Sequence, residues 1–209
     1  MEVQKPSMTS KQRIVIITPI VLLAFMYPVF QLLTGAFEET IIGWYLGLII
    51  YWLIWGIAFP FWIIGKESIK TMIRPQKLNI KVFFLVLFPL LMASLSKFIP
   101  GMGYQKTSLW IFLLYLSTTF GNGFFEEVLW RGVYMKLFPN SILFRIVWPS
   151  IWFALWYYAP GSVSPNKNVI ALMIGAGVFG FYLSFLAKKT ETIWWSIICH
   201  TLGAIIMIL

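Results

Sequence analysis

Long apolar stretches recur along the whole chain, and they restrict its fold more than any other feature of the sequence. Most of them approach the length of about 20 residues with which a helix crosses a hydrocarbon layer about 30 Å thick. The fourth stretch is long for one crossing, and the fifth is short and ends at Ala159-Pro160-Gly161. The sequence therefore predicts an all-α fold, a polytopic transmembrane helical bundle with about seven spans. The candidate spans are Ile14–Leu33, Ile41–Ile64, Val82–Ile99, Ser108–Phe138, Ile142–Tyr158, Val169–Ala187 and Thr192–Leu209.

The composition excludes a water-soluble globular domain. Charged residues make up 11% of the chain and hydrophobic residues 60%, whereas a soluble domain carries about 25% charged residues. So few charges cannot cover a surface that faces water. The net charge of +9 is interpreted as a signal for topology and for anionic lipids, because lysines that alternate with long apolar helices do not form a nucleic-acid surface.

Lysine and arginine residues gather on one side of the predicted spans. Twelve of them, from Lys5 to Lys189, fall on that side, and Arg131 lies inside a span. The other side receives only Lys97, Lys106 and Lys167. Because basic loops stay in the cytoplasm, this bias places the N-terminus in the cytoplasm and, with seven spans, the C-terminus on the outer side.

The predicted domain organisation is simple. Residues 1–10 form a short cytoplasmic tail, and residues 11–209 form a single transmembrane helical domain, because no linker, repeat or low-complexity tract divides them. The first span has a core of about 20 residues and no small-residue cleavage site, so it is interpreted as a retained anchor. The single cysteine, Cys199, excludes an intrachain disulfide and a cysteine metal cluster and is interpreted as a packing residue.

Ionisable side chains inside the predicted spans are the candidates for function. Each costs roughly 2.5–3.5 kcal/mol on insertion scales and is usually kept facing the bundle interior. Glu126, Glu127 and Arg131 share the fourth span, and His200, the only histidine, lies in the last. By contrast, Glu38 and Glu39 precede the second span and are interpreted as a solvated turn.

The spacing of the two glutamates and the arginine allows two interpretations. Glu127 and Arg131 are four residues apart, so they share a helix face and can form an internal salt bridge. Glu126 points about 100° away from Glu127 around the helix, so another group must meet it. One glutamate held by arginine and a second presented to a cavity is the arrangement of a general base. A purely structural salt bridge is the alternative.

Glu126 and His200 are predicted to lie at the same depth in the membrane. At a rise of 1.5 Å per residue, Glu126 lies about 15 Å from Lys136 at the cytoplasmic edge, and His200 lies about 12 Å from Thr192. The two therefore reach the same level, which predicts a shared site in a polar cavity between the fourth and last helices. A histidine that only packs among apolar residues is the competing interpretation.

Small and aromatic residues surround this region in the sequence. Gly121 and Gly123 either kink the long fourth helix and open a cavity beside Glu126 or serve ordinary packing. Ala176 and Gly180 lie four residues apart and predict a close helix contact. The eleven tryptophans are interpreted as interface or core residues rather than ligands.

Three elements in the second half of the chain resemble the CPBP family, which includes CAAX proteases and bacteriocin-processing enzymes and is also called the Abi family. Glu126-Glu127-x-x-x-Arg131 is followed about twenty residues later by Ser150-Ile-Trp-Phe153-Ala-Leu-Trp-Tyr157 and then by Trp194-Trp-Ser-Ile-Ile-Cys-His200. The resemblance covers about residues 108–209, and the first three spans match only in being apolar helices. It implies an intramembrane protease in a bacterial cell membrane.

The family pattern is Glu-Glu-x-x-x-Arg, Phe-x-x-x-His and His-x-x-x-Asn or Asp, and the resemblance implies roles for the matching residues. Glu126 would be the base that activates a water molecule, with Glu127 and Arg131 as its supports. His200 would donate a hydrogen bond to the oxyanion formed from the peptide carbonyl. The predicted catalytic residues are Glu126, Glu127, Arg131, Tyr157 and His200.

Two positions depart from the family pattern. Tyr157 stands where the family has histidine, and Ala204 stands where it has Asn or Asp. A tyrosine hydroxyl can donate a hydrogen bond, but it keeps its proton at neutral pH and is a poor base or metal ligand. Alanine offers no polar group. A family-type divalent metal is poorly supported, because one histidine cannot assemble His₂Glu ligation, and no other cofactor is predicted.

The sequence leaves two classes of function open. The first is an intramembrane endopeptidase that cleaves a membrane-associated peptide or protein near the cytoplasmic leaflet. The second is a catalytically degenerate relative that uses the same bundle to bind and regulate a membrane partner. A transporter is disfavoured, because the polar residues gather at one level and no broken helices repeat in the two halves. The expected partners are the lipid bilayer and a membrane-embedded or membrane-associated substrate, and not nucleic acid.

Overall fold

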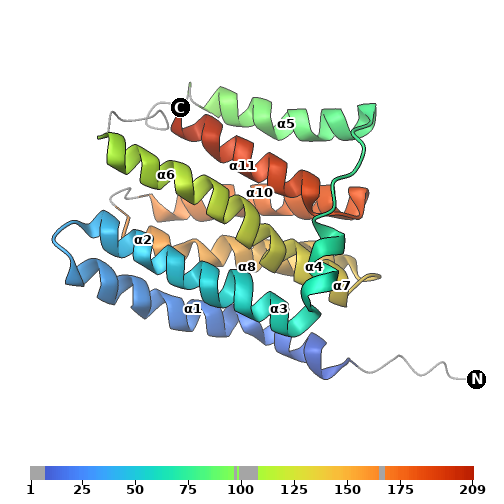
Figure 1. Ribbon diagram of the computed structural model, residues 1–209, viewed down its shortest axis with the longest axis horizontal. Helices are drawn as coiled ribbons and strands as arrows, with labels where there is room; N and C mark the ends of the chain where they lie inside the picture. Colours follow the sequence, from blue (N-terminus) through green and yellow to red (C-terminus); the bar gives the residue numbers. More distant parts are fainter. Residues whose placement is uncertain (1–7, 97, 99–107, 165–167) are drawn as a thin grey trace, which may run out of the picture.

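The computed structural model describes residues 8–96, 98, 108–164 and 168–209, and the regular secondary structure in these ranges is entirely helical. The all-α prediction is confirmed. Most helices run along one common axis and are joined by turns at the two ends of the bundle (Figure 1). In chain order, with η for π-helical segments, the elements are α1 (Ser10–Ala36), α2 (Thr40–Tyr51), η1 (Trp52–Ala58), α3 (Phe59–Ile64), α4 (Lys66–Met72), α5 (Ile80–Ser96), α6 (Leu109–Gly121), η2 (Asn122–Glu126), η3 (Val128–Val133), α7 (Tyr134–Leu137), η4 (Leu143–Val147), α8 (Trp148–Trp156), α9 (Tyr158–Gly161), α10 (Val169–Thr190) and α11 (Trp194–Ile208).

All seven predicted apolar stretches are mainly helical where the structure describes them. Three helical segments in the described ranges are both long and apolar enough to cross a membrane: Ser10–Ala36, Thr40–Ile64 and Val169–Thr190. Ile80–Ser96 and Trp194–Ile208 are apolar but shorter. The number of about seven crossings therefore stays a prediction. The first part of the predicted tail, up to residue 7, lies outside the described residues.

The long fourth stretch forms one helical path from Leu109 to Leu137, and its middle is wound as π-helix. The segments η2 and η3 lie directly before and after Glu127. A π-helix has more residues per turn than an α-helix, so successive side chains turn through a smaller angle than the 100° expected for Glu126 and Glu127. Both carboxylates lie near His200 of α11: Glu127 Oε1 is 2.8 Å from its Nδ1, and Glu126 Oε2 is 3.8 Å from its Nε2.

Two prolines inside helices explain two long-range tyrosine contacts. A proline has no backbone N–H, so the carbonyl four residues before it lacks its helical donor. In α1, Pro19 leaves the carbonyl of Val15 free, and the hydroxyl of Tyr134 donates to it at 3.0 Å. In α5, Pro89 leaves the carbonyl of Leu85 free, and the hydroxyl of Tyr182 donates to it at 2.6 Å. Neighbouring helices thus satisfy the backbone groups that the prolines release, as a bilayer requires.

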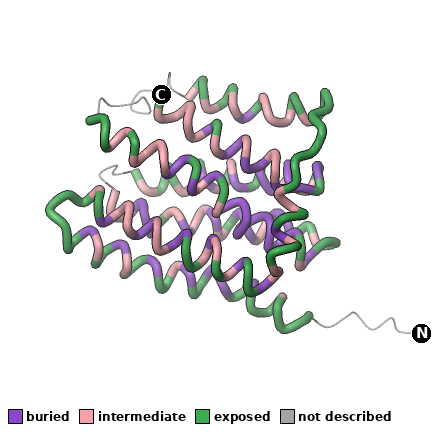
Figure 2. Tube along the Cα trace, in the orientation of Figure 1, coloured by how far each residue is buried: buried purple, intermediate pink, exposed green. Residues whose placement is uncertain are grey.

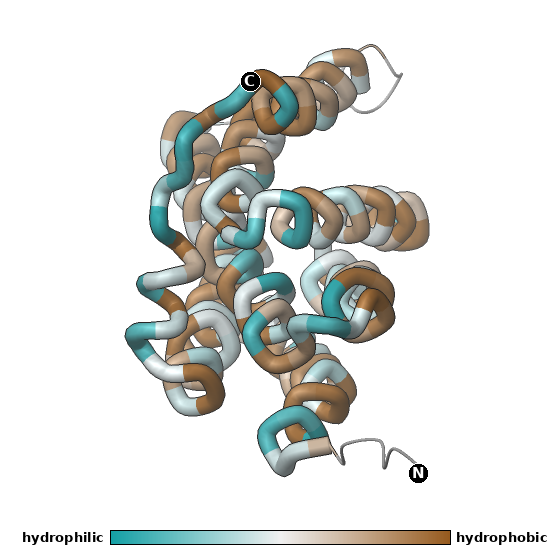
Figure 3. Tube along the Cα trace, turned by 90° about the vertical axis from the view of Figure 1, so that its right-hand side faces the viewer, coloured by the Kyte–Doolittle hydropathy of each residue, from teal (hydrophilic) through white to brown (hydrophobic). Residues whose placement is uncertain are grey.

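The basic segments of the chain meet at one end of the bundle. The start of α1, the turn from α3 to α4, the turn after α7 and the end of α10 all lie toward the right of Figure 1. Hydrogen bonds join them: Gln12 Nε2 donates to the carbonyl of Leu137 at 2.7 Å, and Thr192 Oγ1 donates to that of Met72 at 2.6 Å. Figure 3 looks at this end and shows hydrophilic residues on its turns. Lys5 and the three lysines of the opposite group lie outside the described residues.

The core runs through the middle of the bundle, where α1, α2, η3 and α8 pack together. Every residue from Glu126 to Met135 is buried, so the central helical path is enclosed over two turns and more. Figure 2 shows the same contrast, with buried residues on the central helices and exposed ones on α5. Large apolar side chains also cover the outside: Leu32, Phe84 and Val178 are 73%, 59% and 70% exposed. Such an apolar exterior suits contact with lipid tails.

Candidate functional site

Four ionisable side chains form a buried cluster at the centre of the bundle. Glu126 and Glu127 are 1% and 0% exposed, Arg131 is 0% exposed, and His200 of α11 is 5% exposed. Tyr157, at the C-terminal end of α8, is half-buried and hydrogen-bonded to this cluster. The structure therefore brings together all five residues that the sequence predicted for the site. We call these five side chains the central cluster.

A single carboxylate oxygen of Glu127 contacts both Arg131 and His200. Its Oε1 accepts a hydrogen bond from Arg131 Nη1 at 2.9 Å and lies 2.8 Å from His200 Nδ1. The predicted pairing of Glu127 with Arg131 is confirmed. The other oxygen, Oε2, is buried and has no hydrogen-bond partner within the described residues. Glu127 therefore anchors both the arginine and the histidine.

Arg131 is fixed from three sides. Its Nη2 donates to the carbonyl of Gly180 at 3.0 Å, and its Nε donates to Ser184 Oγ at 3.3 Å, both on α10. Its guanidinium lies 4.3 Å from the ring centre of Phe153 on α8. Gly180 is needed for this approach, because an added Cβ would lie 2.7 Å from Phe153 Cδ1 and 3.0 Å from Arg131 Nη2. The small residue predicted to permit close helix contact thus exposes a carbonyl to a buried cation.

Glu126 is met by side chains from the end of α8. Its Oε1 accepts a hydrogen bond from Trp156 Nε1 at 2.9 Å, and its Oε2 accepts one from the Tyr157 hydroxyl at 3.2 Å. His200 Nε2 lies 3.8 Å from the same Oε2. The predicted proximity of Glu126 and His200 is confirmed.

The polar cavity expected beside Glu126 is not what the structure shows. The side chain of Glu126 is 1% exposed, and both of its oxygens already accept hydrogen bonds from aromatic side chains. The two glycines before it serve close packing rather than an opening, because a Cβ on Gly121 would overlap Trp52 and one on Gly123 would overlap Thr201. The expectation of a cavity is therefore corrected to a closed polar cluster.

Comparison with known families supports the motif-based resemblance. Residues 106–206 match the family model of type II CAAX prenyl endopeptidases, Rce1-like. This segment of the chain is therefore similar to that family. The matched segment contains every member of the central cluster, and together with the apolar helices it supports an integral membrane protein. Neither the curated proteins nor the solved structures contain a match to the chain.

The surroundings of the central cluster include two residues that the sequence did not single out. Trp156 was interpreted as a core or interface residue, yet its indole N–H binds Glu126. Tyr51 of α2 stacks on Trp156 with ring centroids 4.0 Å apart, and its hydroxyl accepts a hydrogen bond from Trp130 Nε1 at 3.0 Å. The position of Trp156 directly before Tyr157 was a usable signal. Tyr51 lies outside the Rce1-like segment, and nothing in its local sequence marks it.

The central cluster does not fit a divalent metal. Glu127 Oε1 is shared by Arg131 and His200, and both oxygens of Glu126 accept hydrogen bonds from aromatic residues. Within the part of the chain that the structure describes, no group of three or more His, Cys, Asp and Glu residues is arranged to hold a metal. We therefore derive no step that uses one. Ala204, one turn after His200, contributes no polar side-chain atom.

Proposed function

We propose that this protein is an intramembrane endopeptidase that hydrolyses a peptide bond in a membrane-associated peptide or protein. The observation that carries the proposal is the placement of Glu126 next to His200 and Tyr157 in a buried cluster of an Rce1-like segment. A carboxylate with two neighbouring donors offers both a base and a place for a negatively charged intermediate.

The formal charges of the central cluster suit acid–base chemistry. Two carboxylates and one guanidinium leave one negative charge in a site that excludes water. One further proton, on Glu126 or on His200, makes the cluster neutral, which burial favours. The two atoms that can exchange this proton, Glu126 Oε2 and His200 Nε2, lie 3.8 Å apart. Glu127 and Arg131 hold the histidine in place and take no part in bond making.

In the proposed reaction, Glu126, His200 and Tyr157 each have a defined role. Glu126 takes a proton from a water molecule while the water oxygen bonds to the peptide carbonyl carbon. The resulting oxyanion accepts hydrogen bonds from His200 Nε2–H and from the Tyr157 hydroxyl. The carbon–nitrogen bond then breaks, and Glu126 returns the proton to the leaving amine. Losing one oxyanion donor typically costs about 10²–10³ in rate, so the absence of a side-chain donor at Ala204 makes the Tyr157 hydroxyl important.

Water must first reach Glu126, and Tyr157 is the side chain that can admit it. Trp156 is 1% exposed and stacked on Tyr51, so it has little room to move. Tyr157 is half-buried at the C-cap of α8. Its hydroxyl also makes the longer of the two hydrogen bonds that Glu126 accepts. A turn of the Tyr157 hydroxyl from Oε2 toward the substrate carbonyl would free Oε2 for a water molecule and leave the hydroxyl in place to donate to the oxyanion.

A second candidate function is a catalytically silent relative that binds and regulates a membrane partner. The closed state of Glu126, with both oxygens occupied by Trp156 and Tyr157, favours it. In this case the same hydrogen bonds are structural. The carboxylate then serves to hold the end of α8 against the central helical path.

We also propose that the basic end of the bundle faces the cytoplasm, as the positive-inside rule predicts. Lys70 of α4 lies at this end and is exposed. A cysteine introduced by Lys70→Cys, after removal of Cys199, should resist an impermeant thiol reagent in intact cells and react after permeabilisation. Labelling in intact cells would reverse the orientation.

Cleavage of a membrane-peptide library by the purified protein decides between the two functions. If the protein is an endopeptidase, Glu126→Gln should lower cleavage by 10²-fold or more, because the amide cannot accept the proton from water. Glu38→Gln, at an exposed turn residue, is the matched control and should leave cleavage unchanged. Cleavage that survives Glu126→Gln would remove Glu126 as the base. A protein that binds a membrane partner normally and cleaves nothing would favour the silent relative.

A further inference from the structure

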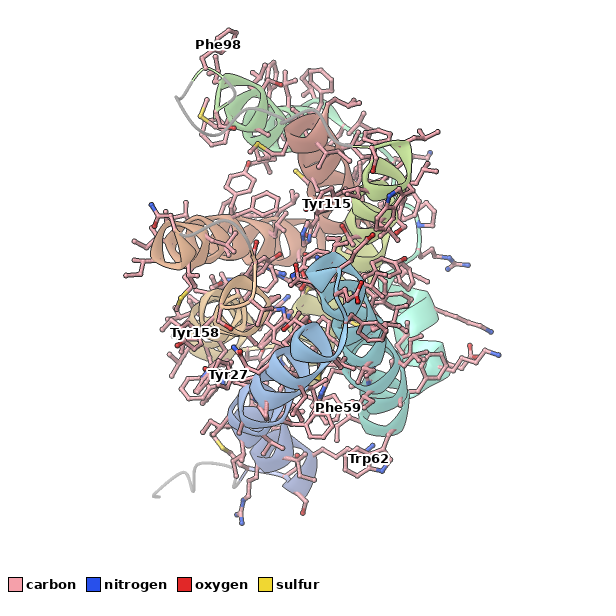
Figure 4. All side chains as sticks on the ribbon, turned by 90° about the vertical axis from the view of Figure 1, so that its left-hand side faces the viewer. Tyr27, Phe59, Trp62, Phe98, Tyr115 and Tyr158 are labelled. Atoms are coloured by element: carbon pink, nitrogen blue, oxygen red, sulfur yellow. The ribbon has the colours of Figure 1, made fainter. Side chains whose placement is uncertain are left out.

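A groove of about 570 Å³ lies between α5 and α10, away from the central cluster. Phe84 and Phe88 of α5 form one wall, and Tyr182 and Phe185 of α10 form the other. Figure 4 shows α5 (green) and α10 (orange) spread apart on one side of α11 (red). Phe84 and Phe88 are 59% and 52% exposed, so the groove opens on the apolar outside of the bundle.

A polar contact joins the two walls of this groove. Pro89 leaves the Leu85 carbonyl without a helical donor, and the Tyr182 hydroxyl fills that place at 2.6 Å. Phe88 packs on the same tyrosine, with ring centroids 5.8 Å apart. This contact fixes α5 to α10 part-way along the groove. The groove is therefore part of the fold rather than an accidental gap between side chains.

The lining of the groove changes from apolar to cationic at the basic end of the bundle. Lys81 lies in the first turn of α5, and Lys189 lies in the last turn of α10. Lys189 Nζ lies 5.6 Å from the ring centre of Phe185, so it stays over the groove. Among the ion pairs of the described residues, neither lysine has a carboxylate partner, while nearby Glu191 pairs with Arg145. Two exposed positive charges thus lie at one end of the apolar groove.

We propose that this groove binds one anionic phospholipid, with an acyl chain between α5 and α10 and the headgroup phosphate between Lys81 and Lys189. An apolar groove that opens toward lipid tails accepts an acyl chain, and two unpaired lysines at the headgroup level attract a phosphate. The site does not depend on the catalytic role of Glu126. α10 carries both features on different faces, since Gly180 and Ser184 contact Arg131 while Tyr182 and Phe185 line the groove.

The charge requirement is tested by measuring bound lipid with native mass spectrometry on the purified protein. Dioleoyl phosphatidylglycerol should bind at least tenfold better than dioleoyl phosphatidylcholine, because each lysine near an anionic headgroup contributes about fivefold. Lys81→Gln with Lys189→Gln should abolish this preference. Lys66→Gln with Lys77→Gln removes two exposed lysines outside the groove and should keep it. Equal loss in both double variants, or no loss in the first, would overturn the site.

The apolar part of the site is tested separately. Phe84→Ala removes a groove wall, and Phe120→Ala on α6 removes a side chain of similar exposure, 56%, outside the groove. Only Phe84→Ala should weaken binding of the dioleoyl lipid, by about threefold to tenfold, and it should not change binding of a dihexanoyl lipid with the same headgroup. Competition by millimolar inorganic phosphate with equal effect on both lipids would show a phosphate site and contradict a lipid site.

Discussion

Charged groups next to the two sides of α10 lie in opposite environments: Arg131 of η3 contacts its inner side, and Lys189 of α10 itself lies at its outer side. Toward the centre, Arg131 is 0% exposed and is bound by a carboxylate, a backbone carbonyl and a hydroxyl. Toward the groove, Lys189 is exposed, its Nζ lies 5.6 Å from the ring centre of Phe185, and it takes part in none of the ion pairs of the described residues. The buried cation is compensated by the protein itself, whereas the exposed one is left for solvent, lipid or a ligand.

The comparison shows how depth in the bundle determines what a charge requires. A buried charge without a partner is destabilising by several kcal/mol, so each residue around Arg131 is constrained in kind and position. An exposed lysine at a helix end has water and headgroups available and tolerates substitution. Substitutions near Arg131 should therefore affect folding, and substitutions near Lys189 should affect binding.

The largest effect on stability is expected at Glu127. Glu127→Ala leaves Arg131 buried without a carboxylate and should lower the free energy of unfolding by about 3–5 kcal/mol. Glu126→Ala should cost less, about 1–3 kcal/mol, because the buried Trp156 indole loses its acceptor while Tyr157 can turn toward the exterior. Thermal midpoints and yields in detergent measure both. Equal losses for the two variants would remove the separate structural role of Glu127.

The next effect is on activity, and it concerns the two departures from the family pattern. Tyr157→His with Ala204→Asn restores an imidazole and a carboxamide beside the Glu126–His200 pair. In a catalytically silent protein each restored group should raise peptide cleavage by about 10²-fold. In an active protein the gain should be small, because the Tyr157 hydroxyl already serves the reaction. Both single variants and the double variant are compared with Glu126→Gln versions, and a double variant that gains activity independent of Glu126 would contradict the assigned site.

A smaller effect on stability is expected where α10 approaches the centre. Gly180→Ala places a Cβ 2.7 Å from Phe153 Cδ1, and such overpacking costs typically about 1–3 kcal/mol. Gly175→Ala in the same helix is the control, since a Cβ there meets nothing within 4 Å. It should be neutral or stabilising, because alanine favours helix over glycine. Similar midpoints for both variants would mean that Arg131 does not need close contact with α10.

The two proline-released carbonyls repeat the contrast between centre and periphery, and the smallest effect is expected at the peripheral one, that of Leu85. Tyr134→Phe leaves the buried Val15 carbonyl unpaired and should cost about 1–3 kcal/mol, whereas Tyr182→Phe at the partly buried Leu85 carbonyl should cost about 0.5–1.5 kcal/mol. Replacing the proline restores the helical donor. In a Pro89→Ala background the cost of Tyr182→Phe should therefore fall toward zero. A cost that is unchanged in that background would show that the hydroxyl acts on another group.

Several features of the fold and the site followed from the order of residues alone. Apolar stretches of helical length predicted the helices, because a bilayer leaves few alternatives for such segments. The spacing of four residues predicted the pair of Glu127 with Arg131, and rise per residue placed Glu126 level with His200. All of these depend on local helix geometry, which is the same in every bundle.

Only the tertiary structure determined which hydrogen-bond partner each buried polar group has. Trp156 reaches Glu126 from 30 residues away, Trp130 donates to Tyr51 from 79 residues away, and Gly180 offers its carbonyl to Arg131 from 49 residues away. The angle at which one helix crosses another determines these contacts, and no short sequence pattern encodes that angle. The π-helical turns directly before and after Glu127 were likewise not predicted from the sequence. The closed state of Glu126 and the groove beside Lys189 could therefore be found only when all the helices were packed together.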